Sequence, residues 1–501
     1  MHIFHIATEL APIAKVGGLS DVLYGLSKEL VRQGHKVEIL IPKYDSIDYS
    51  QLKHLKVEMR EVPCIEGTHQ IQNTVWSAEL DGLRVLLLEP HHPHYYFNRG
   101  KIYGCGDDIE RFTYFCKAAL EYLIKAKAQP DILHLHDWPT ALVAPLCKEV
   151  YEPLGLKPEG IVLTIHNLEY QSKCLPQQLI RIGLHGDTPE MREKLEDLIV
   201  KGTINLLKGG IEYADFVTTV SPAYEKEIKT PHGGSGLDTV LLKYETKLKG
   251  ILNGIDEAFW DPEKDPLLVR RYKTHGLHSL DQLQDVHEGK KENRNHVRMH
   301  FGLKEENSPL VCSVTRLSQQ KGPELILYAL NRSVKKGGQF VLLGSDHGSK
   351  TEQDFLALHG LEQKVGICID RDEALAHLIF AAADMIVIPS YYEPCGLTQM
   401  IALRYGTVPL VRRTGGLADT IFDIDTATVP EELRNGFNFD FYDTGGIDWV
   451  LDRAFTCWAN DRKKWEMIMF NGMQQDFTWK NPTAAYLEIY TSLTQKKTKV
   501  A

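Results

Sequence analysis

The sequence has no segment that could span a membrane and no recognisable export signal. No apolar run among the 501 residues approaches the length of about 18–20 residues that crosses a bilayer. The start, MHIFHIATE, lacks a basic stretch followed by an apolar core. We therefore expect a cytoplasmic protein, with the basic end TQKKTKVA frayed.

Paired cysteines and excess positive charge are also missing. The nine cysteines are an odd number without a C-x-x-C pair or regular spacing, which is typical of reduced thiols. The formal net charge of -10 argues against a general nucleic-acid binder. An anionic ligand would therefore need Lys or Arg side chains placed locally.

Several familiar ligand motifs are absent. The sequence contains no Walker A loop and no G-x-G-x-x-G dinucleotide fingerprint. It contains no H-E-x-x-H and no Cys/His pair with ligand spacing, so we expect no metal. D-x-D occurs at Asp370–Asp372 and Asp423–Asp425, but such triplets often arise by chance.

What the sequence does contain is an alternation of short apolar runs with amphipathic stretches. The apolar runs, each predicted to be a buried strand, lie at residues 1–7, 36–42, 83–89, 131–137, 160–167, 310–316, 338–344, 364–369 and 383–390. Helical periodicity lies between them, for example at 20–34 and 110–128. This pattern is typical of parallel sheets covered by helices on both faces. We expect an α/β protein with two doubly wound domains.

A stretch rich in turn residues interrupts this alternation near the middle of the chain. Asn253-Gly254 and two Asp-Pro pairs at 261–262 and 265–266 favour turns, so we place the domain crossover there. The following polar segment, 274–295, is weakly periodic and is predicted to be a helical excursion. The second sheet is expected to begin near Pro309.

The loop ATELAPIAKVGGLSDVL, before the first predicted helix, contains Lys15 and two adjacent glycines, Gly17 and Gly18. Glycines let a ligand approach the backbone, and a helix start offers N–H groups to an anion. The alternative is a plain strand-to-helix turn with a solvated lysine. The motif is echoed by TGGLADTI at 414–421, which suggests two similar loops in two similar domains.

The segment TRLSQQKGPELI contains two cations at a predicted strand end. Arg316 closes the strand, and Lys321 precedes a helix that should begin at Pro323. Open α/β sheets bind ligands at the carboxyl ends of their strands, and a diphosphate could use both charges and the helix start. The alternative is a solvated basic turn.

The segment PSYYEPCGLTQM places Glu393 after another predicted strand and before a helix start. A carboxylate in that position could bind sugar hydroxyls or stabilise an oxocarbenium-like centre. The alternative is a helix-capping glutamate. In the first half, HLHDWPT and TIHNLEY place His136, Asp137 and His166 at strand ends. A lone histidine is more often structural, but two polar clusters at strand ends favour a site.

Together these segments resemble the bacterial glycogen synthase and starch synthase family, glycosyltransferase family 5. The matching segments follow the family's order over nearly the whole chain: KVGGLSDV, HLHDWPT, TIHN, ILNGID, RLSQQKG, PSYYEPCGLTQM and LRYGTVPLVRRTGGLADT. The resemblance implies the GT-B fold, with two Rossmann-like doubly wound domains facing across a cleft. Residues 1–253 would form the acceptor-side domain and 254–478 the nucleotide-sugar domain. Residues 479–501 would form a helix crossing back to the first domain, plus the basic tail.

The resemblance also implies an activity. The protein would be a hexosyltransferase that moves glucose from ADP-glucose to the non-reducing 4-hydroxyl end of an α-1,4-glucan primer, with retention of configuration. Neither a cofactor nor a metal is implied, because ADP-glucose is a substrate, and no nucleic-acid or membrane partner is expected. The alternatives are a UDP-glucose-dependent or small-acceptor GT-B transferase, and a non-catalytic glucan- or nucleotide-binding protein.

Site residues follow by matched motif. The residues that the resemblance implies in catalysis are Glu393, His166, Arg316, Lys321 and Asp137. Those implied in substrate binding are Lys15, Gly17, Gly18, Asp21, Asn253, Arg371, Cys395, Gly396, Leu397 and Thr398. The two second-domain cations would hold the diphosphate, His166 would contact the glucose, and Glu393 would bind the glucosyl group.

One position departs from the family. Arg371 stands where many relatives carry an aromatic residue against the adenine, and a guanidinium plane can also stack on a base. No protein nucleophile is assigned.

Overall fold

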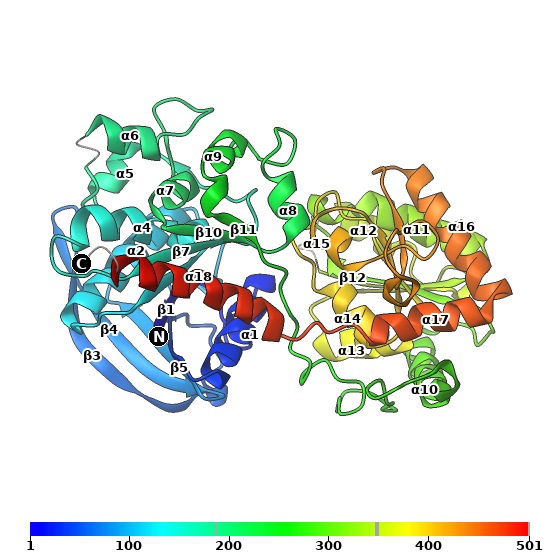
Figure 1. Cartoon of the computed structure of the whole chain (residues 1–501). Coiled ribbons are helices and arrows are strands. Elements are labelled where there is room, and N and C mark those ends of the chain that lie inside the picture. The colour runs from blue at the N-terminus through cyan, green and yellow to red at the C-terminus, as the bar shows by residue number, and fades with distance from the viewer. Residues whose placement is uncertain (186–187, 346–349, 499–501) are drawn as a thin grey trace. The chain divides into compact units, whose positions relative to one another are not determined.

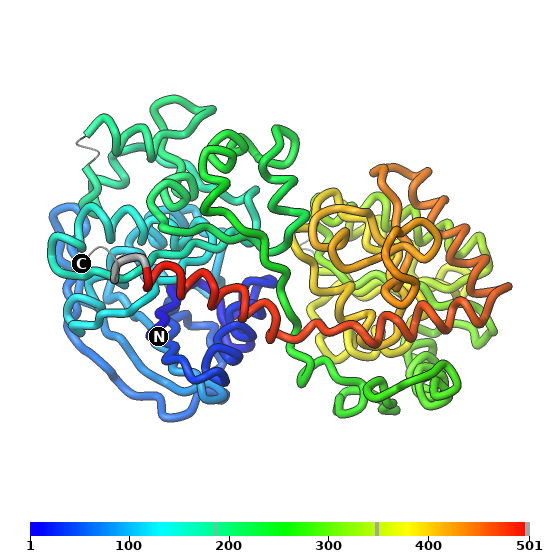
Figure 2. Tube along the Cα trace, viewed as in Figure 1, coloured from blue at the N-terminus to red at the C-terminus, as the bar shows by residue number. Residues whose placement is uncertain are grey.

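The structure is a computed structural model that describes residues 1–185, 188–345 and 350–498. The chain divides into two compact units (Figures 1 and 2). Unit 1 comprises Met1–Gly254 with Trp479–Ala501, and unit 2 comprises Ile255–Thr478. Each unit is built on a single large sheet flanked by helices.

Unit 1 contains a nine-stranded sheet. In spatial order its strands are β11 (Leu248–Gly250), β10 (Phe216–Thr219), β7 (Gly160–Ile165), β6 (Ile132–His136), β1 (His2–Ile6), β2 (Lys36–Pro42), β5 (Leu83–Pro90), β4 (His69–Leu80) and β3 (Lys53–Glu66). Neighbouring strands from β11 to β5 are parallel, whereas β4 is antiparallel to both its neighbours. The central parallel strands are almost wholly buried, as near-continuous apolar strands must be.

Helices cover this sheet on both faces. Right-handed crossovers place the helix after β1 and the helices after β6 on opposite faces, because the chain leaves those strands in opposite directions. One face carries α1 (Gly18–Arg32) and α18 (Lys480–Thr498), which pack on each other. The other carries the mutually packed α2 (Asp108–Lys125), α3 (Trp138–Ala141), α4 (Val143–Leu146) and α7 (Leu206–Tyr213). The remaining short elements are α5 (Pro176–Ile180), α6 (Pro189–Leu195), α8 (Pro222–Glu227), α9 (Asp238–Lys243) and the ribbon β8 (Lys173–Cys174) with β9 (Ile204–Asn205).

Unit 2 contains a six-stranded, wholly parallel sheet. Its strands, in spatial order, are β14 (Val365–Ile369), β13 (Gln339–Ser345), β12 (Leu310–Arg316), β15 (Met385–Ile388), β16 (Val408–Arg412) and β17 (Phe437–Phe439). The helices are α10 (Gln284–Phe301), α11 (Pro323–Lys335), α12 (Lys350–Leu356), α13 (Glu373–Ala382), α14 (Thr398–Arg404), α15 (Gly415–Thr420), α16 (Thr444–Asn460) and α17 (Arg462–Met473). Helices α11 and α16 pack together, as do α10 with α13 and α14 with α17.

The predicted α/β class with two doubly wound sheets is confirmed. Each apolar run predicted as a strand forms one, and the polar segment after the crossover contains the start of helix α10. The apolar runs do not predict the long hairpin of β3 and β4, nor the shorter strands β10, β11, β16 and β17. Strand β3 lies at the sheet edge, is mostly exposed in its first nine residues and carries buried side chains only in its last five, and its pairing with β4 is broken by register shifts. A search for continuous apolar runs cannot detect such an edge strand.

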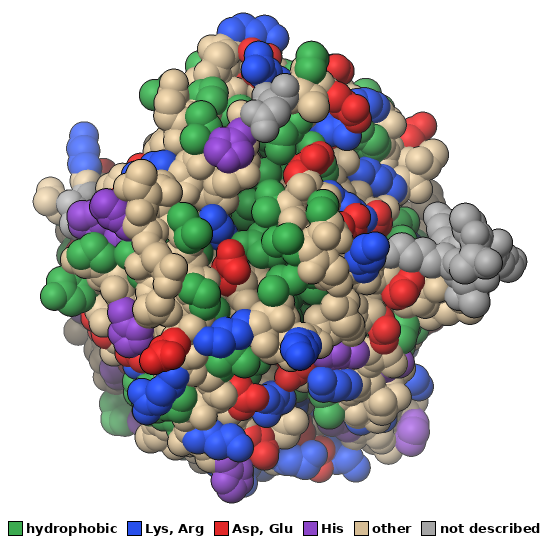
Figure 3. Space-filling view, turned by 90° about the vertical axis from the view of Figure 1, so that its left-hand side faces the viewer, with side chains coloured by type: hydrophobic (Ala, Val, Ile, Leu, Met, Phe, Trp, Pro, Cys, Tyr) green, Lys and Arg blue, Asp and Glu red, His purple; other side chains and the backbone are tan. Residues whose placement is uncertain are grey.

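The composition predicted reduced thiols, no membrane span and no excess of positive charge. All nine cysteines lie among the described residues, and none forms a disulfide. Within the described ranges, no helix is long and apolar enough to cross a membrane. On the face shown in Figure 3, Lys and Arg side chains are interspersed with Asp and Glu.

The C-terminal helix α18 docks on unit 1 through small residues and one buried hydrogen bond. Gly160 of β7 leaves room for Leu493, and Gly25 of α1 leaves room for Trp479. The Tyr490 hydroxyl lies 2.8 Å from Nδ1 of His134 on β6. The fit at both glycines leaves no space for a methyl group.

We predict that Gly25→Ala destabilises unit 1 although alanine is the better helix former. A Cβ at this position would lie 1.9 Å from Nε1 of Trp479, so we expect a loss of about 1–3 kcal/mol in the free energy of unfolding, the usual cost of overpacking. Calorimetry on the single variants and on the double variant with Trp479→Ala checks this. In the Trp479→Ala background the Gly25→Ala penalty should vanish, and an equal penalty in both backgrounds would contradict the packing argument.

Candidate active site

In both units most of the candidate residues follow a pair of neighbouring strands from which the chain departs in opposite directions. Unit 1 runs from β1 to β2 on one side and from β6 to β7 on the other, and β1 pairs with β6. Unit 2 likewise runs from β12 to β13 and from β15 to β16, and β12 pairs with β15. Loops that diverge in this way leave room for a ligand at the carboxyl ends of the strands.

The loop after β1 is folded around a buried carboxylate that the sequence analysis did not single out. Glu9 Oε2 accepts hydrogen bonds from the N–H groups of Val16 at 2.7 Å and Gly17 at 2.8 Å. Its Oε1 accepts one from the Tyr103 hydroxyl at 2.9 Å. Two N–H groups that could have bound an anion therefore hold Glu9. An anion at this loop would have to use N–H groups from Gly18 onward, at the start of α1.

Lys15 and Asp21 form an ion pair across the same loop. The ammonium lies 2.8 Å from Oδ1 of Asp21, which belongs to the first turn of α1, and both side chains are about one-third exposed. An acidic residue is favourable at a helix N-terminus. Asp21 thus holds Lys15 at the loop surface and partly neutralises its charge. The contact of Lys15 with the donor substrate stays a prediction.

Asp137 lies directly after β6 in a positive-φ backbone conformation that non-glycine residues rarely adopt, with φ of 57° and ψ of -175°. Its Oδ1 accepts hydrogen bonds from the N–H groups of His166 at 2.6 Å and Asn167 at 3.3 Å. Burial raises the pKa of the Asp137 carboxyl to about 7, although the two N–H groups act in the opposite direction. The structure therefore brings Asp137 and His166 together at the ends of adjacent strands.

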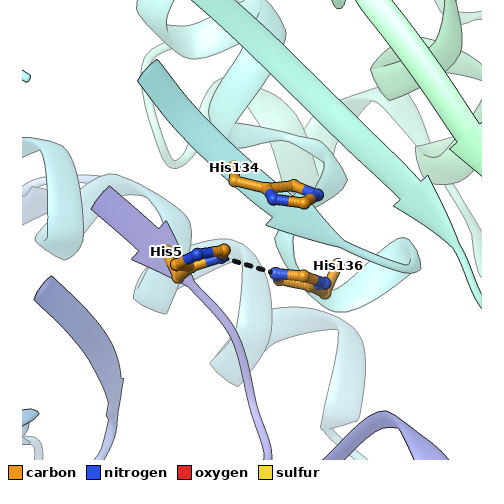
Figure 4. Close-up of side chains that lie close together, drawn as sticks. All are labelled: His5, His134 and His136. Atoms are coloured by element: carbon orange, nitrogen blue, oxygen red, sulfur yellow. Dashed lines mark hydrogen bonds between the residues drawn. The ribbon is translucent and has the colours of Figure 1, made fainter. Parts of the chain in front are cut away.

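A row of buried histidines continues from His166 into the sheet. His166 Nε2 lies 3.0 Å from His136 Nδ1, and His136 Nε2 lies 3.1 Å from His5 Nδ1 on β1 (Figure 4). Burial lowers the pKa of His5 and of His166 to about 3. Burial and the neighbouring imidazoles hold the pKa of His136 well below its usual value, so the row is neutral at physiological pH.

One ligand atom from each of His5, His134 and His136 falls within 4.8 Å of the others, the spacing of a metal-site candidate. The HLH sequence of β6 could have signalled this group, since alternate residues of a strand share a face. The arrangement does not suit a metal. The His134 and His136 rings stack at 4.4 Å, and His5 Nδ1 and His136 Nε2 form a hydrogen bond with each other. Both nitrogens of His134 also have other partners, because Nε2 is hydrogen-bonded to Thr164 and Nδ1 to Tyr490.

In unit 2, Lys321 and Glu393 form a close pair that lines a pocket. Lys321 Nζ lies 2.5 Å from Glu393 Oε2, and the Ser390 hydroxyl donates to the same oxygen at 2.9 Å. Gly396 and Thr398 line the pocket with them. Both bonds fall on Oε2, so Oε1 has no hydrogen-bond partner within the part of the chain that is described. Four of the predicted residues, Lys321, Glu393, Gly396 and Thr398, thus line one pocket, and Cys395 and Leu397 belong to the same loop.

The second Gly-Gly-Leu motif, at residues 415–417, packs against different groups from the first. The Gly416 N–H donates to the Glu393 carbonyl at 3.0 Å. A Cβ at Gly415 would lie 1.9 Å from that carbonyl oxygen, and one at Gly416 would lie 2.0 Å from the Cys395 oxygen. At Gly17, by contrast, an added Cβ would meet nothing within 4 Å. Both motifs begin helices, but the second supports the Glu393 loop rather than facing open space.

Three predicted residues stand apart from these groups. Arg316, at the end of β12, is exposed and forms no ion pair among the described residues. Arg371 follows the edge strand β14, with β13 between that strand and β12, and its N–H donates to Asp370. Asn253 is buried near the unit boundary, and its Oδ1 finds no hydrogen-bond partner in residues 1–185, 188–345 and 350–498.

The two D-x-D triplets have structural partners. Asp372 caps α13 by accepting from the Leu375 N–H at 2.8 Å. Asp423 and Asp425 both accept hydrogen bonds from the Arg453 guanidinium. These contacts explain the triplets without a metal.

Two doubly wound units in one chain, each with charged side chains where its strands diverge, define a glycosyltransferase of the GT-B fold. Residues 2–243 match the family described as the starch synthase catalytic domain, and residues 298–466 match glycosyl transferases group 1. The chain is 47% identical to the glycogen synthase of Protochlamydia amoebophila, over 99% of this chain and 100% of the relative. It is 42% identical to glycogen synthase 1 of Nitrosococcus oceani, over 98% and 99%.

A solved structure agrees with these relatives. The catalytic domain of starch synthase IV from Arabidopsis thaliana, bound to ADP and acarbose, matches with a TM-score of 0.92 and 42% identity over 99% of each chain. Sucrose-phosphate synthase from Thermosynechococcus elongatus, 18% identical with a TM-score of 0.59, shares the fold. The chain belongs to the glycogen synthase and starch synthase family, and it is a hexosyltransferase.

We predict that the buried neutral histidines make unit 1 sensitive to mild acid. Between pH 6.5 and pH 3 the unfolded chain binds protons that His5 and His166 in the folded chain do not, so the free energy of unfolding falls as the pH falls. Each such group contributes a slope of up to about 1.4 kcal/mol per pH unit. Above pH 6.5 both states are neutral and the effect is absent.

The measurement is the free energy of unfolding of unit 1 at several pH values, for the wild type and for His5→Leu. Asp137 has the opposite sign, because its raised pKa makes the folded state bind the extra proton. The difference between the two proteins cancels that contribution. We expect a shallower acid slope in His5→Leu, and identical slopes would contradict the neutral state of His5.

Proposed function

We propose that the protein transfers glucose from ADP-glucose to the non-reducing 4-hydroxyl end of an α-1,4-glucan, with retention of configuration. The observation that carries the proposal is the Lys321–Glu393 pair, which lines a pocket where β12 and β15 end. It is supported by full-length relatives named glycogen synthase, and by the matching starch synthase that was solved with ADP and acarbose.

Lys321 and Arg316 supply the charge for a diphosphate. Lys321 precedes the N-terminus of α11, where helical N–H groups point outward and favour an anion. Arg316 ends β12, the strand that leads into the same loop, and its side chain is exposed. As the glycosidic bond to ADP breaks, negative charge develops on the leaving phosphate, and fixed cations stabilise it. Leaving-group stabilisation is therefore the main catalytic contribution that we assign.

Glu393 orients the glucosyl group. Lys321 and Ser390 occupy Oε2, which leaves Oε1 as an acceptor for sugar hydroxyls. The negative charge of the Glu393 carboxylate can also stabilise the positive charge that develops on the glucosyl group in the transition state. The hydrogen bond from the Gly416 N–H to the Glu393 carbonyl holds the backbone that carries this carboxylate. We assign it no nucleophilic role.

Unit 1 contributes groups for the sugar and the acceptor. His166 presents a neutral imidazole for the glucosyl hydroxyls. Asp137, whose pKa lies near neutrality, can accept from or donate to a hydroxyl and positions sugar or acceptor. Lys15, the Gly17–Gly18 loop and Asp21 belong to the donor contacts that we propose from this unit. Asn253 offers a buried amide oxygen without a partner among the described residues.

We propose that the reaction needs neither a cofactor nor a metal, because the two cations of unit 2 balance the phosphate charge. Arg371, Cys395, Gly396, Leu397 and Thr398 complete the proposed donor contacts. The test is to incubate the protein with labelled ADP-glucose and glycogen, with and without a chelator, and to analyse the linkage of the product. Activity lost to the chelator and restored by Mg²⁺ would refute the metal-free proposal. Equal or better use of UDP-glucose would refute the donor assignment.

We predict that Lys321→Ala lowers kcat by roughly 10²–10³-fold, the order expected for losing one preorganised charge at the leaving group. The matched control is Lys335→Ala, which removes an exposed lysine from the last turn of α11 and should leave kcat unchanged. Steady-state kinetics with ADP-glucose and glycogen measure both. A full kcat with only a raised KM would mean that Lys321 binds substrate and transition state equally.

A further inference from the structure

The histidine row beneath His166 has a direction that the hydrogen-bond pattern determines. We propose that His5 and His136 are positioning residues that hold His166 as the tautomer with its proton on Nδ1, so that His166 meets the sugar as a hydrogen-bond donor. The role toward the sugar rests on the proposed function. The direction of the row rests on geometry alone.

The row consists of three imidazoles joined by two nitrogen-to-nitrogen contacts. His5 Nδ1 lies 3.1 Å from His136 Nε2 (Figure 4), and His136 Nδ1 lies 3.0 Å from His166 Nε2. The outermost atoms are Nε2 of His5, inside the sheet, and Nδ1 of His166, at the end of β7. Nδ1 of His166 has no hydrogen-bond partner among the residues that the structure describes.

Each imidazole in the row is neutral and therefore carries one proton. Each contact needs one donor and one acceptor, so the three tautomers are linked. If His5 donates from Nδ1, then His136 also donates from Nδ1 and His166 carries its free proton on Nδ1. If the row runs the other way, every ring carries its proton on Nε2, and His166 presents a bare nitrogen.

The inner end decides between the two directions. Nε2 of His5 is fully buried and has no hydrogen-bond partner in the described part of the chain. A buried N–H group without an acceptor is rarer in native proteins than an acceptor without a donor. His5 therefore leaves Nε2 bare and donates from Nδ1. His136 then accepts at Nε2 and donates from Nδ1 to Nε2 of His166, so the proton of His166 lies on Nδ1.

A neutral donor suits the reaction that we propose. Positive charge develops on the glucosyl carbon as the leaving group departs, and an imidazolium beside it would oppose that charge. A neutral N–H group can bind a sugar hydroxyl oxygen without that penalty. The row thus gives His166 both a fixed ring orientation and a defined proton, without any charge.

His134 provides an internal comparison, because it shares the site but not the row. Its ring stacks on His136 at 4.4 Å, yet its Nε2 is bonded to Thr164 at 2.7 Å and its Nδ1 to Tyr490 at 2.8 Å. His134 and His5 are both fully buried and face each other on paired strands. Both rings fill space in the core of unit 1, but only His5 is hydrogen-bonded to His136 and so determines which nitrogen of His166 carries the proton.

The direct test is neutron diffraction from deuterated crystals of the ligand-free protein at pH 7. We expect deuterium on Nδ1 of His5, His136 and His166, and none on their Nε2 atoms. Deuterium on Nε2 of His5 or of His166 would overturn the proposal. This measurement needs no activity, so it stands even if the protein proves not to use ADP-glucose.

The functional test compares His5→Leu, His5→Asn and His134→Leu. We expect His5→Leu to lower kcat/KM for glucosyl transfer by about tenfold, the order of one lost hydrogen bond in the transition state. Asparagine can donate from its amide nitrogen near the position of Nδ1, so His5→Asn should recover most of that activity. His134→Leu also loses the hydrogen bonds to Thr164 and Tyr490, so it should lower the melting temperature at least as much as His5→Leu does while keeping the wild-type kcat/KM.

Equal losses of kcat/KM in His5→Leu and His134→Leu, or no loss in His5→Leu, would show that the row serves packing only and would overturn the positioning role. If a leucine variant does not fold, the neutron measurement on the wild type still decides the direction of the row. If the wild type transfers no glucose, the proposed function fails, and the tautomers remain open to the same measurement.

Discussion

The right-handed crossover between parallel strands is the constraint on which this structure depends. It forces helices to alternate between the faces of a sheet as the chain changes direction, and it opens a space where two neighbouring strands send their loops apart. In unit 1 those strands are β1 and β6, and in unit 2 they are β12 and β15. Glu9, Asp137, Lys321 and Glu393 all lie in loops that follow these strands. The strand order therefore places these side chains, whatever their chemical roles.

Within each unit, a buried carboxylate organises the loop at that space, and the two carboxylates have different partners. Glu9 binds backbone N–H groups, so it shapes the loop that presents Lys15. Glu393 binds a lysine and a serine through one oxygen and keeps the other available. Buried carboxylates need such partners, because an unpaired one would be strongly destabilising. The buried histidine row avoids the cost of an unpaired charge by remaining neutral. Its effect on His166 therefore depends on which nitrogen atoms carry the protons, and not on charge.

Sequence patterns predicted much of this, and their failures have physical causes. Continuous apolar runs predicted most of the central strands, although not β10 and β16, because strands buried on both faces are built from apolar residues. The half-exposed β3–β4 hairpin carries no such signal. The motif around Glu393 was informative because glycine, proline and acid occur at close spacing. Glu9 was missed because a lone glutamate in a loop has no pattern. The echo between the two Gly-Gly-Leu motifs predicted two helix starts correctly, but it could not reveal that Gly415 and Gly416 face the Glu393 backbone.

The sequence by itself determined the fold class, the alternation of buried strands with helices, the family and the charged residues at the strand ends, since these follow from local periodicity and from motifs of neighbouring residues. Only the tertiary structure decided which groups meet. The contact of His5 with His136 joins residues 131 positions apart, and the pair of Lys321 with Glu393 joins residues 72 apart. No local pattern encodes such pairs, because they exist only after parallel strands have aligned in register. Burial, which sets the protonation of the histidines and of Asp137, likewise belongs to the packed chain alone.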